Sequence, residues 1–117
     1  MPDETFEELW RQKGGPELVA FQAIFGGAAL PTDEVRSMLG LTLEQFRAAC
    51  GAAERLGIVE SGEARVSFLA FPPDSSQRGR LDWCLEEHKI EFDKLVERIR
   101  SRLLLRYLGS PPGQVAA

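Results

Sequence analysis

Four polar residues lie close together in the sequence and could form hydrogen bonds with nucleic acid: Thr42, Glu44, Gln45 and Arg47. Glutamine and arginine side chains bond to base edges or phosphates, and a glutamate accepts from the amino group of cytosine. Arg65 follows in a second segment, where its guanidinium could contact a phosphate or enter a minor groove. The pattern predicts a local DNA-contacting surface made by two segments of the chain.

The residue types that carry catalysis or bind metals form no known pattern. Cys50 and Cys84 are far apart without a CxxC spacing, and the chain has one histidine, His88. A glycine-rich phosphate loop, an HExxH sequence and a nucleophile elbow are all missing. We therefore expect that the chain is not an enzyme and that it binds no cofactor and no metal ion. We expect the two cysteines to be reduced, buried thiols. We expect His88 to be a hydrogen-bonded packing residue rather than a ligand or pH switch, and Trp10 and Trp83 to pack in the core rather than line a ligand pocket.

Length and composition fit one globular domain. The chain has 117 residues, of which 44% are hydrophobic and 27% charged. Its net charge of −4 argues against a protein that coats nucleic acid non-specifically, because that mode needs many lysines and arginines. No stretch approaches the ~18 apolar residues of a membrane-spanning helix, and the acidic N-terminus is unlike a secretory signal. These features predict a cytoplasmic protein with no membrane partner.

The first quarter of the chain carries two helical patterns. Thr5 with Glu8 has the capping-box spacing and opens a helix within residues 1–15. Pro16 fits the first position of a second helix that runs to about residue 25. We expect both helices to bury one apolar face.

A helix, a tight turn and another helix follow. After a loop at residues 28–30, a third helix is expected to stop at Gly40. Thr42 with Gln45 is a second capping box, and it opens a fourth helix that ends at Gly57. The turn between the two helices is therefore short.

The second half of the chain predicts a hairpin and then one long helix. Apolar and polar residues alternate from Ile58 to Ala70 around a polar turn at residues 61–63. A proline-rich break precedes a continuous helix expected from about residue 78 to 108. At ~1.5 Å per residue this helix would be on the order of 45 Å long, so part of it should contact another surface.

Apolar residues of that helix follow the spacing of a coiled-coil seam. We call this set the predicted seam: Leu81, Leu85, Phe92, Leu95, Ile99 and Leu103. The spacing predicts a homodimer joined through these side chains. Arg98, Arg102 and Arg106 form a cationic stripe near the C-terminal end. It either complements the helix dipole or contacts phosphate beside the fourth helix.

The segment from Asp33 to Val59 resembles the helix-turn-helix core of the winged-helix transcription regulators, a group that includes MarR-like, ArsR-like and PadR-like repressors. The similarity rests on the turn glycine, the residues that cap the fourth helix and those that end it: Gly40, Leu41, Thr42, Phe46, Glu54, Gly57, Ile58 and Val59. It covers about Glu17 to Phe71, with the hairpin in the place of the wing. The resemblance implies a mainly α winged helix-turn-helix with a small β-hairpin and a long C-terminal dimerisation helix.

The helical patterns and this resemblance together predict four parts of the chain. Residues 1–15 are the N-terminal helix and 16–73 the winged helix-turn-helix. Residues 74–108 are the long helix and 109–117 a disordered tail.

Two functions follow from this reading. In the first, a homodimeric DNA-binding regulator inserts residues 42–52 into the major groove. In the alternative, a protein-interaction module docks a partner through the small residues Ala48, Gly51 and Ala52, because a mid-helix glycine costs ~1 kcal/mol and suggests a close approach. Acidic residues beside Arg65 favour the alternative, since they would repel the phosphate backbone.

Overall fold

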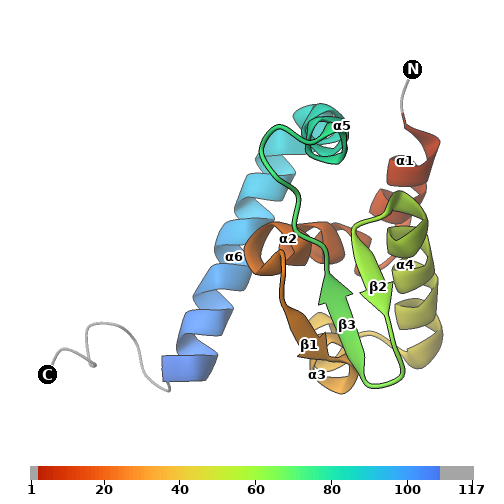
Figure 1. Cartoon of the computed structure of the whole chain (residues 1–117). Coiled ribbons are helices and arrows are strands. Elements are labelled where there is room, and N and C mark those ends of the chain that lie inside the picture. Colours follow the sequence, from red (N-terminus) through yellow and green to blue (C-terminus); the bar gives the residue numbers. More distant parts are fainter. Residues whose placement is uncertain (1–2, 109–117) are drawn as a thin grey trace, which may run out of the picture.

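The chain forms a mainly helical fold with a small antiparallel sheet and a long C-terminal helix (Figure 1). The structure is a computed structural model that describes residues 3–108, with side chains through residue 105; the predicted tail at 109–117 lies outside this part. The elements in chain order are α1 (Glu4–Arg11), α2 (Gly15–Phe25), β1 (Ala29–Pro31), α3 (Thr32–Leu39), α4 (Leu43–Leu56), β2 (Val59–Ser61), β3 (Arg65–Phe68), α5 (Ser76–Leu85), the 3-10 helix η1 (Glu86–His88) and α6 (Lys89–Leu108).

The sheet has three strands in the order β1-β3-β2, one more than the sequence predicts. β2 and β3 form the expected hairpin, with Glu60 opposite Ser67. β1 occupies the segment predicted as a loop, and it pairs antiparallel with β3 so that Leu30 lies opposite Val66. The loop prediction is wrong because a three-residue strand has no readable period, and its hydrogen bonds come from a partner far along the chain.

α1 begins at a different cap from the one predicted. The Asp3 carboxylate, not the Thr5 hydroxyl, accepts from the helix N–H of Phe6 at 3.0 Å. The same carboxylate accepts from Arg80 of α5, at 2.6 Å from Nε and 3.1 Å from Nη2. This guanidinium lowers the pKa of Asp3, although partial burial opposes the shift. Asp3 therefore both caps α1 and ties it to α5.

The helix-turn-helix segment has the predicted local structure. Gly40 ends α3 with φ of 65°, and Gly57 ends α4 with φ of 83°. At the start of α4 the Thr42 hydroxyl accepts from the Gln45 N–H at 3.2 Å, and the Gln45 side chain accepts from the Thr42 N–H at 3.0 Å. Both halves of the capping box are confirmed.

The predicted continuous helix over 78–108 is wrong, because the chain bends at η1 between α5 and α6. In Figure 1 α5 is seen nearly end-on while α6 runs down the side of the molecule. At the bend the His88 ring stacks on Trp10 with ring centroids 4.6 Å apart, and its Nε2 lies 3.3 Å from Oε1 of Glu7. These contacts hold the bend against α1, so α6 packs back on α2.

The residues of the predicted seam pack against the core of their own chain. Leu81, Leu95 and Ile99 are buried in the core, and the other three seam residues pack partly buried against it. The 45 Å helix that was expected to need a second surface does not exist, since the bend lets both helices cover their own domain. The large apolar residues that remain exposed are others: Leu43, Trp83, Ile90, Leu104 and Leu105. Trp83, expected in the core, is 52% exposed.

The core lies between α1, α2, α4, the sheet and the inner sides of α5 and α6. Its largest fully buried side chains include Phe6, Phe21 and Phe68. The two cysteines are free and buried, as predicted, and burial raises the pKa of each thiol to about 11. Within residues 3–108 no helix is long and apolar enough to span a bilayer.

We expect Asp3→Ala to lower the free energy of unfolding by about 1–2 kcal/mol, because it removes the cap of α1 and the acceptor of Arg80. Asp3→Asn keeps a capping oxygen and should cost less. Since Arg80 lowers the pKa of Asp3, the carboxylate stabilises the fold above its unfolded pKa of about 3.9, and this contribution is lost as the pH falls through the lower folded value. Urea unfolding at pH 7 and at lower pH measures both effects. Asp82→Ala removes only an exposed pair with Arg78 and should change stability by less than about 0.5 kcal/mol.

Gly51 within α4 and Gly57 at the C-terminal cap of α4 should respond to alanine with opposite signs. Gly51→Ala is expected to stabilise by about 0.4–1 kcal/mol, because its backbone is helical and the nearest atom to a new Cβ is Arg55 Nη1 at 3.7 Å. Gly57→Ala is expected to destabilise by about 1–2 kcal/mol, because the residue has φ of +83°. Thermal or urea unfolding of both variants gives the comparison, and equal signs would contradict it.

Candidate functional site

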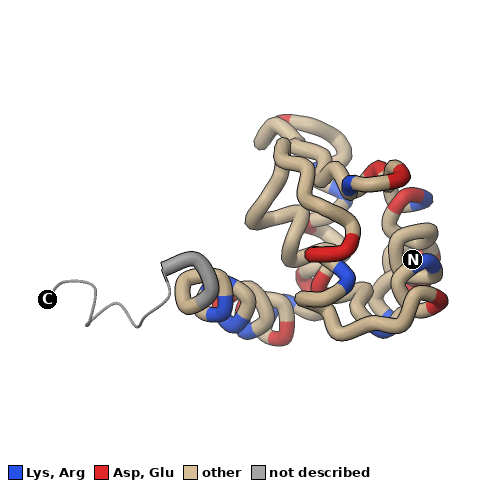
Figure 2. The backbone as a smooth tube through the Cα atoms, turned by 90° about the horizontal axis from the view of Figure 1, so that it is seen from below, with Lys and Arg blue, Asp and Glu red and all other residues tan. Residues whose placement is uncertain are grey.

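The residues predicted to contact nucleic acid lie at one end of the molecule. α3, the N-terminal end of α4 and the turn between β2 and β3 meet at the bottom of Figure 1, and Figure 2 views this end from below. Thr42, Glu44 and Arg47 are exposed on α4, Gln45 is half-buried, and Arg65 is exposed at the base of the hairpin turn. The structure thus brings both predicted segments to the same end, which we call the α4 surface.

The capping box fixes how Thr42 and Gln45 are presented. The Thr42 hydroxyl oxygen accepts from the Gln45 backbone N–H, and the Gln45 carbonyl oxygen accepts from the Thr42 backbone N–H. The amide nitrogen of Gln45 can still donate outward. Arg47 lies two residues after Gln45, and it forms no ion pair among the described side chains. The Thr42 O–H, the Gln45 amide nitrogen and the Arg47 guanidinium are therefore the side-chain donors that the start of α4 offers to a ligand.

The charge of the α4 surface is not cationic. Residues 32–65 carry six acidic side chains and four arginines. Arg55 is held by Glu8 of α1 at 2.6 Å, and Arg65 donates to the Ala29 carbonyl at 3.3 Å. Glu54 is turned to the hairpin, where it accepts from the N–H and the hydroxyl of Ser61. Phosphate contacts here depend on single guanidinium groups rather than on a positive field.

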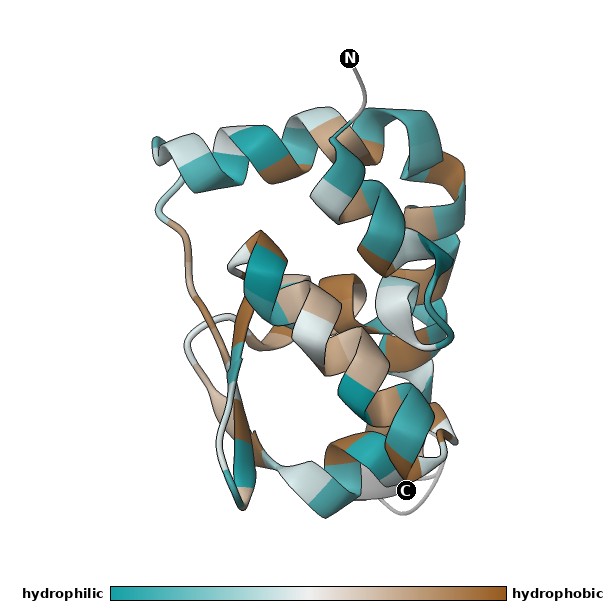
Figure 3. Ribbon diagram, turned by 90° about the vertical axis from the view of Figure 1, so that its right-hand side faces the viewer, coloured by the Kyte–Doolittle hydropathy of each residue, from teal (hydrophilic) through white to brown (hydrophobic). Residues whose placement is uncertain are grey.

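The small-residue face that was expected to dock a partner is largely occupied. Ala49 and Ala52 are fully buried, because α4 packs against α1 and α2. Figure 3 views the molecule from the side of α1 and α4, where hydrophobic positions alternate with hydrophilic ones along both helices. Of the predicted face, Ala48 is exposed and Gly51 half-buried. The prediction of a docking face is therefore wrong for Ala52, which is buried, while Ala48 remains exposed.

The arginine stripe of α6 does not lie beside α4. Arg98 and Arg102 face α2 and α3, and the side chain of Arg106 lies outside the described part. Figures 1 and 2 both place α6 and α4 on opposite sides of the molecule. The stripe is therefore separated from the residues predicted to read DNA.

A pocket of about 480 Å³ that no sequence pattern predicts lies between α2, α3 and α6. Its walls combine apolar side chains with one carboxyl and two guanidinium groups: Glu17, Phe21, Met38, Leu39, Leu95, Arg98, Ile99, Arg102 and Leu103. Burial raises the pKa of Glu17, and the charge of Arg98 opposes that shift. Such a lining suits a small amphipathic molecule. Neither Trp10 nor Trp83 lines it.

We compared the chain with protein-family models, curated proteins and solved structures. No protein-family model, no curated protein and no solved structure matches this chain. Its activity must be inferred from the chemistry of its own surfaces.

Proposed function

We propose that this chain binds double-stranded DNA through the α4 surface and acts as a transcriptional regulator of the winged-helix type. The element order α2-β1-α3-α4-β2-β3, with a short turn at Gly40 and a hairpin after α4, is compatible with that layout. The observation that carries the proposal is the exposed first half of α4, which lies at the same end of the molecule as the hairpin turn (Figure 1).

In this proposal the start of α4 enters the major groove, which is wide enough for a helix. Gln45 donates from its amide nitrogen, and Arg47 forms forked bonds to a guanine or a phosphate. Glu44 accepts from a cytosine amino group and repels phosphates, so it favours one register over others. Arg65 contacts the backbone or the minor groove from the hairpin. Thr42 serves mainly to fix the first turn of α4.

A protein-interaction module is the second candidate, and the acidity of the α4 surface favours it. Six acidic residues against four arginines over residues 32–65 suit a basic partner better than a polyanion. Leu43 adds an apolar side chain that is 48% exposed at the start of α4. Because Ala52 is buried, such a partner would contact Leu43, Ala48 and the hairpin turn instead of the small-residue face.

The homodimer also stays a proposal, and it needs a contact other than the predicted seam. Leu81 and Ile99 are buried within one chain and cannot reach a partner. The outer side of α6 leaves Ile90 and Leu104 exposed, at 74% and 51%. A second copy of the chain that packs on this side would set the spacing of two DNA half-sites.

An electrophoretic shift assay at about 50 mM salt, where phosphate contacts are strongest, tests DNA binding. We expect the wild-type chain to shift duplex DNA. Arg47→Ala should weaken binding and reduce the slope of log affinity against log salt by about 1. Lys89→Ala is the matched control, because it removes an exposed positive charge at the other end of the molecule. A folded wild-type chain that gives no shift at this salt would remove the DNA proposal and leave the protein-interaction module.

Light scattering at micromolar concentration tests the dimer. We expect a dimer for the wild-type chain and a monomer for the double variant Ile90→Glu, Leu104→Glu, because two carboxylates would be buried in the contact. Phe92→Tyr, a substitution on the inner side of α6, should leave the dimer intact. A monomeric wild-type chain would exclude half-site spacing set by the protein.

A further inference from the structure

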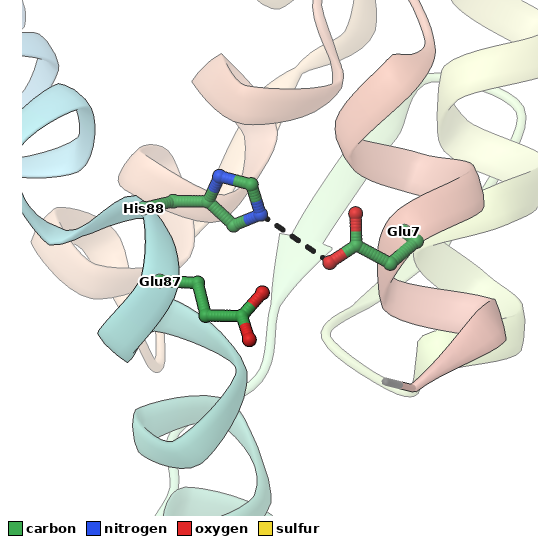
Figure 4. Close-up of side chains that lie close together, drawn as sticks. All are labelled: Glu7, Glu87 and His88. Atoms are coloured by element: carbon green, nitrogen blue, oxygen red, sulfur yellow. Dashed lines mark hydrogen bonds and ion pairs between the residues drawn. The ribbon is translucent and has the colours of Figure 1, made fainter. Parts of the chain in front are cut away.

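Three potential metal ligands converge where α1 meets η1, at the end of the molecule opposite the α4 surface (Figures 1 and 4). Glu7 comes from α1, and Glu87 and His88 come from η1. Their carboxylate oxygens and imidazole nitrogen all lie within 4.8 Å of one another. We propose that these side chains bind one divalent transition-metal ion of the Zn²⁺ type.

The separation of two of the ligands already fits a metal. Zinc bonds to histidine nitrogen and carboxylate oxygen are about 2.0–2.1 Å long, so two ligands of a tetrahedral ion lie about 3.3–3.4 Å apart. Nε2 of His88 and Oε1 of Glu7 are 3.3 Å apart. Glu87 is exposed, so rotation of its side chain can close the remaining distance without moving the backbone.

The imidazole is held in place before any ion binds. Its ring stacks on Trp10 at 4.6 Å with an interplanar angle of 27°, and the Phe6 ring lies 6.0 Å away. The side chains of His88 and Glu7 are 20% and 26% exposed, so the pair lies in a partly dehydrated corner. A fixed ring in such a place loses little conformational freedom on binding.

A hydrogen bond between Glu7 and His88 does not by itself account for Glu87. The second carboxylate lies beside the first, and within the described residues Glu87 forms no ion pair or hydrogen bond. Two carboxylates at this distance repel each other, and a divalent cation between them removes the repulsion. A divalent cation at this position would therefore bring Glu87 into the same contact as Glu7 and His88.

The donor set selects the class of ion. One imidazole and two carboxylates suit Zn²⁺, Co²⁺, Ni²⁺ or Mn²⁺, whereas copper(I) prefers thiolates and thioethers. Cys84, on the neighbouring α5, is buried with its thiol pKa raised to about 11, which makes it a poor thiolate ligand. Three protein ligands leave a position for water. The ion would join α1 to η1 and so brace the bend that turns α6 onto α2.

Titration of the untagged full chain with Co²⁺ tests the site through its visible absorption. We expect one ion per chain, displaced by Zn²⁺, and a higher unfolding temperature when Zn²⁺ is present. Loss of a group that only hydrogen-bonds to a metal ligand lowers metal affinity about tenfold or more. Glu87→Gln and His88→Gln each remove a ligand itself, so each should weaken binding at least tenfold. Glu86→Gln is the matched control, because it makes the same charge change in the same turn and should leave the affinity unchanged.

Three outcomes would overturn the site: no binding in the micromolar range, unchanged affinity in Glu87→Gln, or strong near-ultraviolet absorption from a cobalt–thiolate bond. His88→Gln can disturb packing on Trp10, whereas Glu87 is exposed and its variant tests the ligand without the fold. Circular dichroism checks that each variant is folded. None of these measurements depends on whether the chain binds DNA.

Discussion

The packing of α1 against α4 is the contact on which the other elements depend. Phe6 and Leu9 are fully buried, and the small side chains of α4 let the two helices approach closely. α1 and its N-cap also form polar contacts with two further elements, since Asp3 bonds to Arg80 of α5 and Glu7 to His88 of η1. Glu8 adds an ion pair with Arg55 of α4. The contacts of Asp3 and Glu7 hold α5 and η1 against α1, where the C-terminal helices turn.

This arrangement also decides which surfaces are left for function. Because α4 packs against α1 and α2 and buries Ala49 and Ala52, the part of α4 that is left for a ligand is its first half, beside the hairpin turn. Helix α1 also places Glu7 and Trp10 beside the bend at η1, at the other end of the molecule. The proposed DNA contact and the proposed metal site are therefore separate, and one can fail without the other.

Electrostatics limits how the α4 surface could bind DNA. Affinity for a duplex comes largely from phosphate contacts, and residues 32–65 carry more acids than arginines. With few phosphates neutralised, binding would have a shallow salt dependence and would rely on base contacts by Gln45 and Arg47. The arginines of α6 do not offset this, since Arg98 and Arg102 line the pocket against α2 and α3.

The sequence by itself determined the features that are made by neighbouring residues. The capping box of Thr42 and Gln45, the left-handed glycines at 40 and 57 and the hairpin depend on hydrogen bonds and backbone angles within a few residues. Only the tertiary structure decided the rest: strand β1, the bend at η1, the burial of Ala52 and the pocket around Glu17. Each of these needs a partner distant in sequence, and a pattern of apolar spacing says that a face is buried without saying what buries it. The predicted seam is the clearest case, because its residues are buried as expected, but by their own chain.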